Sequence, residues 1–158
     1  MNHTTTLLFL FVTLISCHQE VPFDAQQKEE VRKAVRKTLY DYDEAIKKGG
    51  LTAEFPYLDD SEDFFWTPPG FTAAISFDSV ATILKQNASL YKSIENSWVI
   101  LNIFPLSNEI ATYNGKVKST MTDTSGQVTT FHLLESGTLI KREDGWKLLS
   151  GQTALLEE

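Results

Sequence analysis

The chain has 158 residues, of which 42% are hydrophobic and 22% are charged, and this composition is typical of one globular domain. A formal net charge of -7 argues against a nucleic-acid-binding protein, because phosphate recognition needs a basic patch and the sequence shows none. The acidic balance otherwise favours solubility and indicates no particular partner.

The N-terminal segment predicts export and lipid attachment. An uncharged apolar run at 7–15 has the length of a signal-peptide core and is shorter than the roughly 20 residues that span a bilayer. It ends in Leu14-Ile15-Ser16-Cys17, which resembles the bacterial lipobox, and Cys17 is the one cysteine of the chain. We therefore expect a lipoprotein signal peptide at 1–16, a tether at 17–23 and a folded domain at 24–158. The protein would be anchored in the cell envelope through lipidated Cys17, in the periplasm or at the outer membrane.

Two other interpretations of this segment remain open. Residues 1–6 contain no lysine or arginine, although signal peptides usually begin with a positive charge. The segment could therefore be an ordinary cleaved signal, or a buried apolar stretch with a chance cysteine. The sequence does not indicate which membrane or leaflet would hold the anchor.

The first half of the domain is predicted to be mainly helical. A helix from Asp24 to Lys48 presents apolar residues at spacings of three and four, namely Val31, Val35, Leu39, Tyr42 and Ile46. A short helix at 51–57, a solvated acidic loop at 59–63 and a short strand at 64–67 should follow. A second long helix, capped by Ser76 or Asp78, has an apolar stripe that reaches Tyr91.

The second half is predicted to consist of strands. The nearly continuous apolar run at 98–104 is typical of a strand buried on both faces. Residues 110–122 alternate, and Gly126 fits the left-handed position of a hairpin loop that pairs Asp123 with Gln127. A second hairpin at 144–145 would pair Leu139 with Ser150. The predicted inner face comprises Tyr113, Val117, Met121, Phe131, Leu133, Glu135, Leu139, Trp146, Leu148, Ser150 and Gln152.

The order of these elements resembles the SnoaL-like, or nuclear-transport-factor-2-like, domain family. The resemblance rests on the helix at 24–48, the segment Trp66-Thr67-Pro68-Pro69-Gly70, and a final hairpin at 137–149 whose Asp-Gly turn precedes Trp146. It covers about residues 24–156. It implies a cystatin-like α+β fold, in which about three N-terminal helices pack on a cone-shaped, curved, mostly antiparallel sheet. This fold hosts isomerases, cyclases, dehydratases and binding modules, so it does not decide the function.

The inner face suggests a pocket with one candidate catalytic group, Glu135. Among apolar neighbours, desolvation would raise the pKa of this carboxyl and suit it for proton abstraction. The alternative is a structural carboxylate at the rim, hydrogen-bonded to Ser150 or Gln152. Tyrosines at these spacings are more often core than ligand donors. The expected pocket residues are Tyr40, Trp66, Tyr113, Glu135, Trp146, Ser150 and Gln152.

Other chemistry has little support in the sequence. Many SnoaL-like sequences carry a His-x-Ser pair on the last strand, where this chain has Gln152 and Ala154, so any acid–base role of that histidine is absent. His132 is expected on the outer face of the sheet. There is no pair of cysteines or histidines with metal-ligand spacing and no glycine-rich phosphate loop, so we expect neither a metal nor a cofactor.

Two classes of function remain, and the sequence favours the first. One is a membrane-anchored module that binds a small apolar molecule or acts as an accessory protein. The other is a cofactor-free isomerase, cyclase or dehydratase-like enzyme that uses Glu135. An apolar strip on the outer sheet face, made of Leu134, Ile140 and Leu149, further predicts a homodimer. A loop or the C-terminal segment covering that strip is the alternative.

Overall fold

Helix α1 (Ala25–Gly49) forms where the sequence predicts it. Asp24 caps its N-terminus, since the Asp24 carboxylate accepts from the Gln27 amide at 2.8 Å and the Gln27 side chain accepts from the Asp24 amide at 2.9 Å. The apolar stripe is buried, with Val35 and Leu39 at most 1% exposed. The computed structural model describes residues 23–156, so the predicted signal peptide and Cys17 lie outside the described part of the chain.

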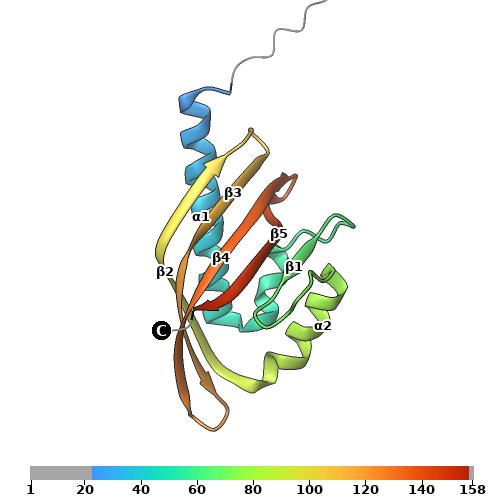
Figure 1. Ribbon diagram of the computed structural model, residues 1–158, viewed down its shortest axis with the longest axis vertical. Helices are drawn as coiled ribbons and strands as arrows, with labels where there is room; N and C mark the ends of the chain where they lie inside the picture. The colour runs from blue at the N-terminus through green and yellow to red at the C-terminus, as the bar shows by residue number, and fades with distance from the viewer. Residues whose placement is uncertain (1–22, 157–158) are drawn as a thin grey trace, which may run out of the picture.

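The remaining elements form an α+β arrangement in which the helices pack on one side of a curved sheet (Figure 1). The sheet order is β1-β5-β4-β3-β2, and among the paired strands of residues 23–156 only β1 and β5 run parallel. The α+β, mostly antiparallel fold is therefore confirmed. The other elements are η1 (Leu51–Tyr57), β1 (Phe65–Thr67), α2 (Phe77–Asn87), η2 (Ala88–Leu90), β2 (Tyr91–Pro105), β3 (Ile110–Asp123), β4 (Val128–Arg142) and β5 (Gly145–Leu156).

The predicted β3–β4 hairpin is confirmed in its register. Ser119 pairs with Phe131 and Val117 pairs with Leu133, while the Asp123 amide donates to the Gln127 carbonyl at 3.0 Å. Gly126 has φ 92, as the hairpin loop requires. Alternation along β3 therefore places one set of side chains, including Tyr113, on the inner face toward the helices.

The predicted β4–β5 register is wrong along the whole hairpin. Between the turn and a β-bulge it is displaced by two residues, since Leu139 pairs with Leu148 and not with Ser150, and this displacement leaves the faces unchanged. Thr138 then pairs with Ser150, so Leu149 is an extra residue. One extra residue exchanges the two faces of the strand from that point onward. Past the bulge, β5 turns Gly151, Thr153 and Leu155 inward and Ser150 and Gln152 outward.

Three further predictions fail where a local pattern was misleading. Strand β2 begins at Tyr91, so the second long helix ends sooner than its apolar stripe suggested. Strand β2 is an edge strand with Ile100 and Phe104 about half exposed, and it is not buried on both faces. In the acidic segment, Asp59 is only 3% exposed. A run of apolar or charged residues predicts burial poorly when only one face of the helix, strand or loop packs against a neighbouring element.

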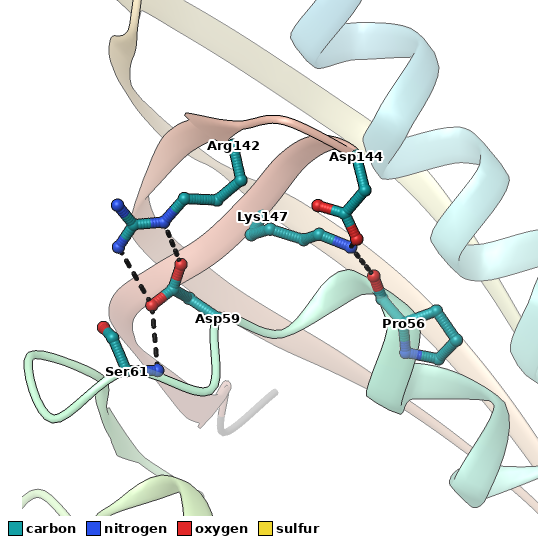
Figure 2. Close-up of polar contacts among 6 residues, drawn as sticks. All are labelled: Pro56, Asp59, Ser61, Arg142, Asp144 and Lys147. Carbon is teal, nitrogen blue, oxygen red and sulfur yellow. Dashed lines mark hydrogen bonds and ion pairs between the residues drawn. The ribbon is translucent and has the colours of Figure 1, made fainter.

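Polar contacts join η1 and the loop after it to the β4–β5 hairpin (Figure 2). Asp59 accepts from Arg142 Nε at 2.6 Å and from the Ser61 amide at 3.1 Å. Lys147 donates to the carbonyl of Pro56 and pairs with Asp144 at 2.7 Å. These contacts hold η1 over one end of the sheet, which fixes one wall of the cavity described below.

Three glycines on the inner face make room for large aromatic rings. A Cβ atom at any of them would lie within 3 Å of a ring carbon on the neighbouring strand. It would also lie within 3 Å of a backbone carbonyl oxygen. Strands with glycine at such positions allow close approach of a covering group. The pairs are Gly115 with Trp98, Gly137 with Tyr113, and Gly151 with Trp66.

Candidate functional site

A cavity of about 500 Å³ lies between the inner face of the sheet and the helical segments α1, η1 and α2. Most of its lining is aliphatic or aromatic, and α2 contributes Val80, Ile83 and Leu84. The volume is in the range of about 300–1,000 Å³ that is typical of small-molecule sites. The described part of the chain contributes no lysine, arginine or histidine to the lining, but it contributes three carboxyl groups, those of Asp43, Glu54 and Glu135.

Glu135 lines the cavity from β4, as the sequence predicts. Its Oε1 accepts from the Tyr113 hydroxyl at 2.6 Å. Burial raises the pKa of Glu135 to about 7, although hydrogen bonds from Tyr113 and Thr153 act in the opposite direction. Near neutral pH this carboxyl is therefore present in both protonation states, as a group that gives or takes a proton must be.

Glu54 is a second carboxyl in the cavity wall, and it comes from η1. It accepts from the Tyr42 hydroxyl at 2.9 Å. Burial raises the pKa of Glu54 to about 7, and the charges of Glu135 and Asp43 add to that rise against the Tyr42 hydrogen bond. The carboxyls are thus close enough to repel one another when ionised.

Asp43 is the third carboxyl, and it comes from α1. The residue is 9% exposed, and burial raises the pKa of Asp43 to about 6, although hydrogen bonding from the side chains of Asn96 and Trp98 acts in the opposite direction. Asp43, Asn96 and Trp98 also line a groove between α1 and strands β2 and β3, so they form the wall between the cavity and that groove. Asp43 Oδ2 is buried without a well-formed hydrogen bond to the protein.

Two more buried polar atoms also have no hydrogen bond of normal geometry in the protein. They are Trp98 Nε1, which lies beside the Asp43 carboxyl, and the hydroxyl of Ser119, a residue with 0% exposure. Both residues line the cavity, and Ser119 pairs with Asn96 across β2 and β3. Buried polar atoms are usually hydrogen-bonded, so this part of the cavity wall is poorly satisfied within the protein.

The structure brings together some of the predicted site residues and separates others. Trp66 and Glu135 line the cavity, and Tyr113 lies behind it with its hydroxyl on Glu135. Trp146 is buried in the core cluster, as predicted for a core residue, and does not line the cavity. Three other predicted residues lie elsewhere: Tyr40 is 49% exposed on α1, and Ser150 and Gln152 face outward past the bulge.

The partners predicted for a structural Glu135, Ser150 or Gln152, are therefore wrong, whereas its structural role itself stays a prediction. The group beside Glu135 on β5 is Thr153, and the Thr153 hydroxyl also accepts from Trp66 Nε1 at 3.1 Å. On the outer face, His132 pairs with Lys118 and Leu156. Within residues 23–156, no cluster of three histidine, cysteine or acidic side chains is arranged to hold a metal ion.

The sequence-based prediction missed Asp43 and Glu54. Asp43 lies between Leu39 and Ile46 on the buried stripe of α1, at spacings of four and three. A carboxyl on an apolar helical stripe is a signal of a buried ionisable group that could have been used. Glu54 had no such signal, because a short 3-10 helix shows no extended periodicity.

The fold and the cavity define a class of α+β domain with a cone-like sheet and a partly open cavity between sheet and helices. The chain matches no family model and no curated protein sequence significantly. Solved structures do match it, and they show that the fold is the SnoaL-like, or nuclear-transport-factor-2-like, fold.

Three of these similar structures illustrate the match. A protein of Novosphingobium aromaticivorans described as a scytalone dehydratase has a TM-score of 0.75 at 11% identity, over 85% of this chain and 89% of that one. A hexachlorocyclohexane dehydrochlorinase of Novosphingobium barchaimii has a TM-score of 0.66 at 14% identity, over 85% and 92%. A Streptomyces avermitilis protein described as a dehydratase of this fold family has a TM-score of 0.65 at 14% identity, over 82% and 99%.

Proposed function

We propose that the domain binds one small, largely apolar molecule in the cavity, and that lipidated Cys17 holds the domain at a membrane of the cell envelope. The observation that carries the first part is the cavity itself, about 500 Å³ with a mainly apolar lining and a few polar groups. Such a combination is the usual form of a small-molecule site. The second part rests on the lipobox-like sequence before Cys17. As a separate finding, residues 23–156 contain no helix that is long and apolar enough to cross a membrane.

The binding function can be tested with a neutral apolar probe, N-phenyl-1-naphthylamine, whose fluorescence increases in an apolar site. Saturable binding to the purified full chain is expected. Val80→Trp, which places an indole in the cavity from α2, should weaken binding at least tenfold. The matched control is Val128→Trp, because Val128 is 61% exposed on the β3–β4 hairpin and does not line the cavity. Equal binding to both variants would contradict the proposal.

A second candidate function is cofactor-free proton abstraction from the bound molecule, as in a dehydratase or an isomerase. The specific observation in its favour is the Glu135–Tyr113 pair, in which a carboxyl with a pKa of about 7 faces an apolar cavity. Glu135 would act as the base. The Tyr113 hydroxyl, through its hydrogen bond to one oxygen of the Glu135 carboxylate, would hold that carboxylate in position. The similar structures described as dehydratases and as a dehydrochlorinase are consistent with such chemistry.

Hydrogen–deuterium exchange separates this candidate from binding alone. An apolar ketone such as 2-tetralone, incubated in D₂O with the full chain, should exchange its acidic C–H protons faster than in buffer. The exchange should increase as pH rises through about 7 and should be lost in Glu135→Gln. A rate equal to that in buffer, with the ketone shown to be bound, would leave a binding function without catalysis.

A further inference from the structure

The charge of the cavity wall indicates which chemical class of molecule it binds. Three acidic side chains reach the cavity from three elements, and the described lining has no basic group to offset them. Tyr42 donates to Glu54, and Tyr113 and Thr153 donate to Glu135. Asn96 and Trp98 lie beside the Asp43 carboxyl, but its Oδ2 atom accepts no hydrogen bond of normal geometry. Carboxylates only accept hydrogen bonds, and most of their accepting positions here have no donor from the protein.

From these contacts we infer that the natural ligand is an organic amine, an apolar body with a cationic nitrogen that Asp43, Glu54 and Glu135 surround. This inference rests on the proposed binding function and specifies its ligand class. An ammonium group has only donors, so it complements a set of acceptors better than a hydroxyl or a carbonyl does. A bound cation would also reduce the repulsion among the three carboxylates.

The aromatic lining supports the same class. Trp66, Trp98, Tyr42, Phe64 and Phe131 all reach the cavity. The faces of such rings attract cations, most strongly when water is excluded, and they also pack against an apolar body. The burial of Asp43 is an observation separate from the acidic count. Its Oδ2 atom has no hydrogen bond of normal geometry, and Asn96 and Trp98 offset the burial of the carboxylate only in part, because its pKa remains raised.

The protonation of the site predicts how affinity depends on pH. Below about pH 6 the three carboxyls are largely protonated and neutral, and above about pH 7 they are increasingly charged. Amine affinity should therefore increase with pH across that interval. The titratable and charged groups around Asp43 form two sets. On the cavity side they are Glu54, Glu135, Tyr42 and Tyr113. Along the groove between α1 and strands β2 and β3 they are Tyr40, Glu44, Lys47, Glu95 and Lys118, and Lys47 pairs with Glu95 at 3.4 Å.

The test compares two probes of the same shape, 1-naphthylmethylamine and 1-naphthylmethanol, by calorimetry on the full chain at pH 5.5 and pH 8. The amine should bind at least tenfold more tightly than the alcohol at pH 8, and the difference should shrink at least threefold at pH 5.5. Asp43→Asn should weaken amine binding at least tenfold and alcohol binding less than twofold. Glu54→Gln should do the same if Asp43→Asn lowers the melting temperature.

The control is Glu62→Gln, which removes the same charge from an exposed position outside the cavity and should change neither affinity. If alcohol and amine bind equally well, or the alcohol binds better, the amine inference is wrong while the binding function stands. If neither naphthyl probe nor the neutral fluorescent probe binds, the proposed function fails and this inference fails with it.

Discussion

At the scale of single residues, Glu135 shows how one position connects fold and chemistry. Its place on β4 follows from the alternation of the strand, and its contact with Tyr113 follows from the register of β3 with β4. Gly137, the next inward residue on β4, leaves room for the Tyr113 ring. Burial in the cavity wall then raises the pKa of the Glu135 carboxyl.

The raised pKa of Glu135 predicts a pH-dependent effect on stability. A carboxyl with a pKa of 4.5 in the unfolded chain and about 7 in the folded one disfavours folding increasingly as pH rises between those values. Glu135→Gln should therefore gain stability relative to the wild type by about 2 kcal/mol between pH 5.5 and pH 8. Urea unfolding at the two pH values measures the change, and the exposed-site variant Glu62→Gln should show none. A constant difference across pH would contradict burial of the charge.

A second residue-scale prediction concerns Gly151 beneath Trp66. A Cβ atom there would lie 2.4 Å from the Ser136 carbonyl oxygen and 2.5 Å from the indole, so the strands would have to shift. Gly151→Ala should lower the free energy of unfolding by about 2 kcal/mol, as overpacking does. Gln152→Ala on the exposed face of the same strand should change it by no more than about 0.5 kcal/mol. A neutral Gly151→Ala would mean that the indole is free to move.

At the scale of elements, the contact between the loop after η1 and the β4–β5 hairpin is the clearest test of the architecture. Arg142 holds the nearly buried Asp59 carboxylate, and its guanidinium keeps the pKa of Asp59 below its usual range. Arg142→Ala should cost about 2 kcal/mol in unfolding free energy, because it leaves a buried carboxylate without its charged partner. Arg32→Ala, which breaks an exposed pair with Glu29 on α1, should cost under about 0.5 kcal/mol. Equal costs would show that Asp59 is well solvated.

The elements that the sequence predicts well are those with a long, regular pattern. Helix α1 and the β3–β4 hairpin follow from apolar spacing and from one glycine turn, and they account for the correct placement of Glu135. The β4–β5 bulge has no signature in the sequence, because one extra residue in a strand changes neither composition nor turn residues. The errors at Ser150 and Gln152 come from that bulge. Asp43 lies on an apolar stripe that the sequence already shows. The position of Glu54 depends on how η1 packs against α1, which the sequence does not show.

At the scale of the whole molecule, two predictions concern the attachment of the protein to a membrane and its dimerisation. Cys17→Ser should leave the domain folded and release it from membranes, because the thiol that accepts the lipid is gone. Metabolic palmitate labelling and membrane fractionation measure this. Ser16→Ala, which keeps a small residue before the cysteine, is the matched control and should label normally. Unchanged labelling of Cys17→Ser would end the lipoprotein interpretation.

The homodimer remains a prediction, and the structure supplies a sharper position for its test. On the outer sheet face, Ile100 and Leu134 are each about half exposed, and Lys116 lies between them and pairs with both. Exposed apolar side chains that gather on one face often mark an interface. Leu134→Glu should convert a dimer to a monomer in sedimentation at tens of micromolar, and Thr130→Glu on the same strand should not. A wild-type monomer at that concentration would refute pairing through this face.

The bulge at Leu149 also has a consequence for how such a cavity can change. The residues of β5 past this point exist in two alternating sets, and one backbone insertion selects which set faces the cavity. A second inserted residue, placed after Ser150, would shift the partners by one and turn Gln152 and Ala154 toward the cavity and Thr153 and Leu155 away from it. A single-codon insertion would thus exchange the polar group beside Glu135 for another and change the lining of the cavity in one step.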